Sequence, residues 1–328
     1  SYTGSIQNLF VKNSDLYVHT EHNLWKLSVA PQTMQTNSDT VEVGQGAFLD
    51  RDPIRIFNNQ DSFSRGGCID KFTSVYGGGD YVWLDRNSGS VLSLGEGMGS
   101  LSDIGLSRWF RNNAELNLNT QFLALTGLDY PFKGTSCNLN VGYIATLDPQ
   151  HNRYILTKKD YKLTEEVLTG LAELTYNNDG TLFDPAIVIG NFYYDDNGFY
   201  IGIGDGDAVT DRDILLEYLD YTDPLIAENK SWTISYSFKD KLWSSWHSYL
   251  PNWLYNDSYT FYSFITNPLT TSNESIWRHG FGQFQTYYGV KYDFIIDYIY
   301  KKDMYSDATY DTLEYTGNSW VKSVINDT

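Results

Sequence analysis

The most acidic stretch of the sequence is the first candidate for metal chemistry. It places four aspartates in one short Gly/Asp segment, namely Asp205, Asp207, Asp211 and Asp213. Aspartate oxygens are good ligands for Ca²⁺, but the EF-hand pattern needs a third oxygen ligand where Val209 stands. We therefore interpret the segment as a turn that leads into a helix, with loosely bound Ca²⁺ as the alternative. No obligatory metal and no cofactor is expected.

Histidine and cysteine offer little more for metal binding or nucleophilic chemistry. His19 and His22 are the only closely spaced histidines, and they fall at a strand end and a turn, which predicts a solvated hairpin tip. Cys68 and Cys137 lie far apart and form no Cys-x-x-Cys motif. Two buried thiols are the prediction, with one disulfide bridge as the alternative, and a zinc site is not expected.

Signatures of catalysis are absent from the sequence. There is no Gly-x-Ser-x-Gly elbow and no Walker loop, and Gly77-Gly78-Gly79 precedes a strand, which is typical of a hairpin turn rather than a phosphate cradle. Glycoside hydrolysis needs two carboxyl groups across a cleft, but 41 acidic residues provide too many pairs to single one out. We predict that the protein is not an enzyme.

The net charge and the short apolar runs argue against two further classes of protein, namely nucleic-acid-binding and membrane-inserted proteins. The 328 residues carry a net charge of −18, and the densest basic pairs are only Lys158-Lys159 and Lys301-Lys302, so sequence-specific nucleic-acid binding is not expected. Apolar runs such as Ala186–Ile189 are of strand length, so membrane insertion is not expected either. The chain begins at Ser1 without a methionine or a visible signal peptide, which suggests a processed chain or a fragment.

The elements that would hold any site are predicted to be mostly β. Aromatic residues make up 16% of the chain, and short apolar runs alternate with Gly, Asn and Asp turns. We predict four antiparallel meanders, at Leu9–Leu27, Ile69–Leu94, Gly142–Leu156 and Trp232–Tyr249. The fourth is expected to continue through Ser258–Ile265 and Glu274–Arg278.

Repeated meanders favour a β-propeller-like fold, with one domain over residues 1–328. Irregular or inserted segments are expected near residues 30–62, 100–140 and 205–228, and Asn37–Gln60 and Asn112–Gln121 are predicted to be irregular. The predicted helices are short. They are one over Ile104–Phe110 with Ser102-Asp103 as its cap, a turn at Thr164–Leu168, and one at Thr210–Tyr218.

The densest unusual feature is the aromatic segment Ser231–Phe264. Alternation in its first strand places aromatic side chains on one face and hydroxyls on the other, which predicts a half-buried strand. We expect a sheet core built by Trp232, Tyr236, Phe238, Trp243 and Trp246. Beyond Pro251, Trp253 and Tyr255 are the candidate interface residues, and a carbohydrate-stacking shelf is the alternative.

This segment also carries a family resemblance. SWTISYSFKDKLWSSWHSYLPNWLY (Ser231–Tyr255) resembles the aromatic meander of the tail muzzle, or stabilization, proteins of crAss-like bacteriophages. CIDKFTSVYGGGDYVWLDRNSGSVLSLGEGMGSLSDIGLSRWF (Cys68–Phe110) is similar to phage tail nozzles in its order of meander, Asp-x-x-x-Gly turn and short helix ending in Trp-Phe. SIWRHGFGQFQTYYG (Ser275–Gly289) and KYDFIIDYIY (Lys291–Tyr300) resemble the stretch that follows, so that about half of the chain is covered.

The resemblance implies a structural role without catalytic residues. It implies a section of a longer polypeptide that forms a homo-oligomeric ring, expected to be a hexamer, in the tail of a virion assembled in the bacterial cytoplasm. The ring would form and close the distal DNA conduit, with DNA passing through its lumen, and would dock tail adaptor or ring proteins and fibres. The alternatives are a glycan-binding or glycan-cleaving β-propeller, such as an adhesin or a glycosidase-like protein, and a bacterial surface scaffold.

Overall fold

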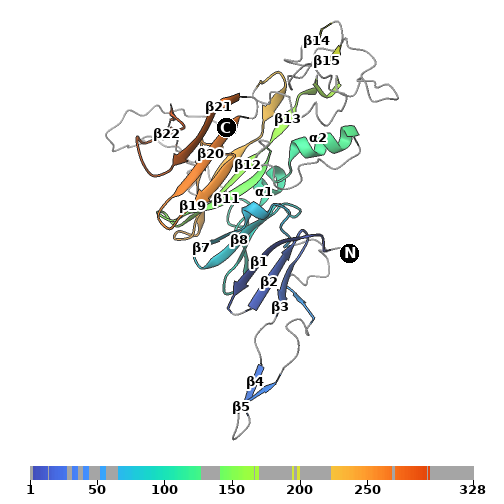
Figure 1. Cartoon of the computed structure of the whole chain (residues 1–328), viewed down its shortest axis with the longest axis vertical. Coiled ribbons are helices and arrows are strands. Elements are labelled where there is room, and N and C mark those ends of the chain that lie inside the picture. Colours follow the sequence, from blue (N-terminus) through green and yellow to red (C-terminus); the bar gives the residue numbers. More distant parts are fainter. Residues whose placement is uncertain are drawn as a thin grey trace, which may run out of the picture.

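A computed structural model of the chain is mostly β, with several antiparallel sheets and few helices (Figure 1). It describes residues 3–13, 15–27, 32–35, 40–43, 52–56, 66–126, 141–165, 167–169, 194–195, 198–199, 223–267, 270–293 and 295. The predictions for Cys137, the aspartates 205–213 and the helix Thr210–Tyr218 lie outside the described residues.

The N-terminal sheet confirms the first predicted meander. Its strand order is β1-β2-β3-β6, with antiparallel pairing throughout. The fourth strand comes from a segment that was predicted to be irregular, and a separate hairpin precedes it. The bounds are β1 (Ile6–Lys12), β2 (Asp15–Thr20), β3 (Leu24–Leu27), β6 (Ile54–Arg55) and, for the hairpin, β4 (Gln32–Gln35) with β5 (Thr40–Val43).

The second sheet is a four-stranded meander with a shorter first strand than predicted. Lys71–Thr73 forms a 3₁₀ turn, because the Thr73 amide and hydroxyl both donate to the Asp70 carbonyl, at 2.9 and 2.7 Å. Only the residues after this turn join the sheet. Its strands are β7 (Val75–Gly77), β8 (Asp80–Asp85), β9 (Ser90–Leu94) and β10 (Met98–Ser100).

The third and fourth predicted meanders join into one central sheet. Its order is β11-β12-β17-β18, because β12 pairs with β17, with Tyr154 opposite Tyr236. A long insertion therefore separates the two hairpins in sequence but not in space. The strands are β11 (Gly142–Asp148), β12 (Arg153–Lys159), β17 (Trp232–Ser237) and β18 (Leu242–His247).

The last predicted strands form a sheet of their own rather than continuing the fourth meander. This C-terminal sheet has the order β19-β20-β21, with β19 (Trp253–Asn256), β20 (Phe261–Asn267) and β21 (Thr270–Arg278). Three two-stranded ladders complete the strands: β13 (Tyr161–Leu163) with β16 (Ala227–Asn229), β14 (Tyr194–Asp195) with β15 (Gly198–Phe199), and β22 (Thr286–Tyr287) with β23 (Val290–Lys291).

The helices differ from the prediction in position. α1 spans Ser107–Asn113, so it begins five residues after Ser102, the predicted cap. Gly105 has φ +80°, which an α-helix cannot contain, and the Ser102 hydroxyl instead accepts the Val91 amide at 3.3 Å. The turn at Thr164 is confirmed, since the Leu168 amide donates to the Thr164 carbonyl at 3.0 Å.

α2 (Asn117–Thr126) lies where an irregular segment was predicted. Its first amides are capped from a distant strand end: Asn117 and Leu118 donate to the Asp160 carboxylate at 2.8 and 3.2 Å. The cap comes from a residue far away in sequence, so no local pattern marks the start of this helix.

In the described part of the chain, three apolar cores separate the four larger sheets. The same strands contribute to two of them: Tyr81 and Trp83 of β8 face the N-terminal sheet, whereas Val82 of the same strand faces the central sheet. In β12, Tyr154 faces the second sheet and Ile155 faces the C-terminal sheet. Because side chains alternate along a strand, the sheets form a stack in chain order, from the dark-blue strands to the orange and brown ones in Figure 1.

β17 is buried on both faces, so the prediction of a half-buried strand is wrong. Its hydroxyl side has internal partners: Thr233 Oγ1 donates to the Tyr249 carbonyl at 2.7 Å, and Ser237 Oγ donates to Asp240 at 2.7 Å. The C-terminal sheet covers this side of the central sheet, and the hydrogen bonds make burial of the hydroxyls possible.

Two tryptophans provide a matched test of this stack. Trp83 is fully buried between the first two sheets, whereas Trp246 of β18 is 55% exposed. Trp83→Ala should lower the free energy of unfolding by about 3–5 kcal/mol, and Trp246→Ala should change it by less than about 1 kcal/mol. Urea denaturation followed by circular dichroism measures both. Equal losses for the two variants would contradict the assignment of the core.

Candidate functional site

A β-bulge in β18 creates an exposed aromatic surface. Ser245 pairs with Ser235 and Trp243 pairs with Tyr236, so Ser244 is an extra residue in the strand. Without it, Trp243 and Trp246 would point to opposite faces of the sheet. With it, both rings lie on the face that carries Ile234 and Tyr236.

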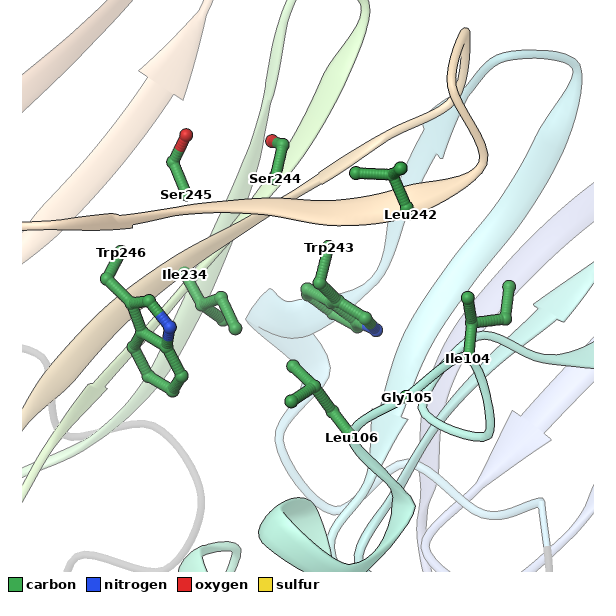
Figure 2. Close-up of a pocket in the computed structure, with 9 residues that line it drawn as sticks. All are labelled: Ile104, Gly105, Leu106, Ile234, Leu242, Trp243, Ser244, Ser245 and Trp246. Carbon is green, nitrogen blue, oxygen red and sulfur yellow. The ribbon is translucent and has the colours of Figure 1, made fainter. Parts of the chain in front are cut away.

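The two tryptophans border a shallow pocket with a cavity volume of about 240 Å³. Figure 2 shows both rings and Ile234 on one side of the β18 ribbon, with Leu106 approaching from the turn before α1. None of the nine lining residues is charged; they are Ile104, Gly105, Leu106, Ile234, Leu242, Trp243, Ser244, Ser245 and Trp246. Leu242 and Ile104 are exposed at the rim.

Helix α1 holds the aromatic wall in place. The Trp109 ring lies 4.5 Å from that of Trp246 and 4.8 Å from that of Trp232, both in edge-to-face geometry. Trp243 is fixed by its indole N–H, which donates to the Leu101 carbonyl at 2.9 Å. The exposed Trp246 ring therefore rests on a preformed support.

A buried ion pair positions α1 and α2 behind this wall. Lys158 Nζ lies 2.8 Å from Asp160 Oδ2 and also donates to the carbonyls of Asn113 and Glu115 at the end of α1. Asp160 in turn caps α2 through the amide of Asn117. Burial lowers the pKa of Lys158, and the neighbouring Asp160 opposes that shift. Each charge faces the helix end whose dipole it complements.

The pocket can bind an apolar group but offers no acid–base chemistry. β18 is the edge of the central sheet within the described residues, and its bulge disfavours the addition of another strand. A partner would therefore make contact through side chains placed between Trp246 and Leu106. The hydroxyls of Ser244 and Ser245 lie on the other side of β18 (Figure 2), where Ser244 bonds to Ser235.

The predicted core aromatics divide into two groups. Trp232 and Tyr236 are buried, and Phe238 and Trp243 pack against the same core while partly exposed. Trp246 was predicted to be core but is mostly exposed, because the bulge directs it past the edge of the second sheet toward α1. The most exposed of the five predicted core aromatics thus belongs to the pocket.

The predicted interface residues also divide. Tyr255 is 59% exposed, as expected. Trp253 is only partly exposed: it packs against the core between the central and C-terminal sheets, with its ring 4.7 Å from that of Phe72. The prediction that Trp253 is an exposed interface residue is therefore wrong.

His19 is not at a solvated hairpin tip. It is fully buried, donates from Nε2 to the Gly66 carbonyl at 2.9 Å, and accepts the Tyr81 hydroxyl at Nδ1, at 3.2 Å. Burial lowers the pKa of His19 to about 4. His22 lies in the turn, where its Nδ1 is 3.4 Å from Asn87 Nδ2, so the two histidines do not form a pair.

One serine–histidine pair went unnoticed in the sequence. Tyr288 OH donates to Ser263 Oγ at 2.9 Å, and Ser263 Oγ donates to His279 Nε2 at 2.7 Å. Ser263 is fully buried, and His279 lies between the Phe261 and Tyr249 rings. A buried serine cannot meet a substrate, so we interpret the pair as a structural network.

Two further findings concern metals and membranes. Among the residues described above, no group of three His, Cys, Asp or Glu side chains could hold a metal ion. In the same residues, no helix is long and apolar enough to span a bilayer. Cys68 is a buried free thiol, and burial raises its pKa, so the prediction of a buried thiol holds for this cysteine.

The burial of His247 makes the stability of the fold depend on pH. Burial lowers its pKa from 6.5 to about 4, and its Nε2 finds no hydrogen-bond partner in the described part of the chain. Between these values the unfolded chain binds a proton that the folded chain does not, so stability is complete above pH 6.5 and is lost as the pH falls toward 4. The contribution of this histidine to the free energy of unfolding should fall by about 2 kcal/mol from pH 7 to pH 5.

His247→Phe keeps an aromatic ring at this position and removes the group that titrates. From pH 7 to pH 5, the free energy of unfolding should fall by about 2 kcal/mol more in wild type than in this variant. His22→Phe, a substitution in the turn, is the control and should follow wild type. An identical pH dependence for His247→Phe and wild type would contradict the burial of this ring.

Comparison with known proteins assigns no family. No protein-family model matches the sequence, and no curated protein matches it. The function must therefore be argued from the pocket and the surfaces of the chain.

Proposed function

We propose that this chain is a non-enzymatic structural protein of a bacteriophage virion, part of the tail muzzle or nozzle that forms and closes the distal DNA conduit. The observation that carries the proposal is the uncharged pocket at the bulged edge of β18, where Trp246 is 55% exposed on a preformed aromatic support. A rigid aromatic anchor of this kind suits a lasting protein–protein contact.

The stacked sheets support a propeller-like architecture. Four antiparallel sheets succeed one another along the chain, and neighbouring sheets pack face to face across three cores. Successive small antiparallel sheets in face-to-face contact are the building plan of propeller blades. A propeller-bearing section would supply the stiffness that a tail component needs.

The acidity of the chain fits a conduit wall. A net charge of −18 on each of several copies repels the phosphate backbone, so DNA can pass without binding. In this proposal the protein forms a homo-oligomeric ring, a hexamer by family resemblance. The ring contacts tail adaptor or ring proteins and fibres, and it assembles in the bacterial cytoplasm.

A glycan-binding role is the second candidate. The exposed Trp246 ring offers an aromatic face on which a sugar ring can stack. Binding of the purified chain to an array of bacterial glycans, lost in Trp246→Ala, would favour this role.

The structural role is tested on virions. Gold-labelled antibodies against the purified chain should mark the distal tail of particles from a phage that carries the gene. Absence of the label from intact and from partly dissociated particles would overturn the proposal.

The docking pocket has its own test by complementation of a phage that lacks the gene. Trp246→Glu should lower the titre at least about tenfold, the factor that 1.4 kcal/mol of contact energy represents. Tyr259→Glu is the matched control, because Tyr259 is 78% exposed and lies away from the pocket. Equal titres for the two variants would exclude the pocket as a docking site.

A further inference from the structure

A second pocket lies between the turn that joins β8 to β9 and the junction of α1 with α2. Its cavity volume is about 550 Å³, which is within the range of small-ligand sites. Gly89 of the turn has φ +60°, and a Cβ there would come within 2.9 Å of the Arg111 Cα, so only a residue without a side chain lets the turn approach α1 this closely. We call this cavity the arginine pocket.

The wall of the arginine pocket differs in charge from the chain as a whole. The chain has 41 acidic and 23 basic residues, yet the wall holds two arginines, Arg86 and Arg111, and one acid, Glu115. Within the described part of the chain, Glu115 forms no ion pair with either arginine, and its Oε1 accepts the Thr120 hydroxyl at 2.5 Å. The wall thus carries more positive than negative charge.

Arg111 has hydrogen-bonding capacity to spare. Its side chain is exposed on α1, where Nη2 donates to Ser107 Oγ at 2.7 Å and Nε donates to the Ser107 carbonyl at 3.4 Å. Among the described residues, Nη1 of Arg111 has no partner and the guanidinium has no carboxylate. Ser107 therefore holds this guanidinium while leaving donors for a ligand.

Arg86 is the more buried of the two arginines. Its side chain is 14% exposed, and Nε lies 3.2 Å from Oδ2 of Asp70, which is fully buried. In the part of the chain that the structure describes, both Asp70 oxygens lack a hydrogen bond and Arg86 donates to no other acceptor. Because a guanidinium has five N–H donors, Arg86 can bind a further acceptor without leaving Asp70.

A third polar group of the pocket lacks a partner. The Oδ1 atom of Asn119, on the first turn of α2, is buried and makes no hydrogen bond to the described residues. Buried polar atoms are rarely unpaired, and the two ends of a side-chain amide exchange by rotation. Such a rotation places the NH₂ group of Asn119 in the buried position, where it can donate to an acceptor in the pocket.

We propose that the arginine pocket binds a carboxylate group. Guanidinium groups match the two oxygens of a carboxylate, and the Asn119 amide adds a further donor. A singly charged group fits better than a phosphate dianion, because Asp70 already balances Arg86 and Glu115 lies on the wall. The inference does not depend on the proposed function, and this pocket shares no lining residue with the pocket at β18.

Two ligands of the same shape test the charge of the bound group. N-acetylglutamate amide carries one carboxylate, and N-acetylglutamine amide carries a neutral amide in its place. In NMR titrations of the purified chain, the glutamate derivative should bind at least about tenfold more tightly, because only a carboxylate forms charge-assisted hydrogen bonds on both sides. Inorganic phosphate should bind more weakly than the glutamate derivative.

Variants test the two arginines. Arg111→Gln removes an exposed side chain, so the fold should survive, and the affinity for the glutamate derivative should fall at least about tenfold. Arg108→Gln is the matched control, because Arg108 is exposed on the same helix but lies outside the pocket, and it should bind like wild type. Arg86 is tested in the double variant Asp70→Asn/Arg86→Gln, which leaves no unpaired buried charge and should show the same loss. Thermal melting checks that each variant is folded.

The outcomes decide both the site and the class of ligand. No binding of the glutamate derivative, equal affinities for the two derivatives, or equal affinities of Arg111→Gln and Arg108→Gln would overturn the site. Tighter binding of inorganic phosphate than of the glutamate derivative would overturn the carboxylate class. Acetate distinguishes two sources of the group, and both results support the site: equal affinity indicates a free small acid, and at least about tenfold weaker affinity indicates an acidic side chain.

Discussion

The structure depends on strands that serve two cores at once. In β8 and β12, odd and even side chains enter different apolar layers, so each of these strands is the shared wall of two neighbouring cores. A sheet with an apolar face must bury that face against another layer. Because the walls are shared, the loss of one layer exposes apolar side chains of the next, and the four sheets should be stable only as a stack.

The pocket is a consequence of the same arrangement. The central sheet ends at β18, where the second sheet no longer covers it, and α1 fills the remaining space with Trp109. Lys158 and Asp160 hold α1 and α2 against β12 through helix-end carbonyls and amides. The bulge at Ser244 then directs Trp246 onto this support instead of onto the other face of the sheet. The Trp109 ring against which it packs makes the exposed indole a preorganised anchor.

The meanders could be predicted from the sequence, because their signals are local. Alternating apolar residues with Asn, Asp and Gly turns marked β2, β8, β11 and β17 to within a few residues. The errors arose where a distant residue decides the outcome. Asp160 starts α2, β12 pairs with β17 across a long insertion, and the covering C-terminal sheet buries the hydroxyl side of Thr233 and Ser235.

The pocket was only partly predictable for a related reason. The aromatic segment was identified, but period-two alternation cannot place Trp243 and Trp246 on one face, since that requires the extra Ser244. The exposure of Trp246 depends on the bulge, and the partial burial of Trp253 depends on packing between sheets. The functional proposal draws on family resemblance and on the surface that the bulge creates, and only the resemblance could be obtained from the sequence.

Native-state hydrogen exchange tests the shared-wall stack most directly. If the sheets are stable only together, the slowest amides of β8, β12 and β17 should exchange with one common free energy that equals the global free energy of unfolding. They should also respond equally to low concentrations of denaturant. Separate free energies for the second and central sheets, with one sheet opening while the other stays protected, would contradict the account.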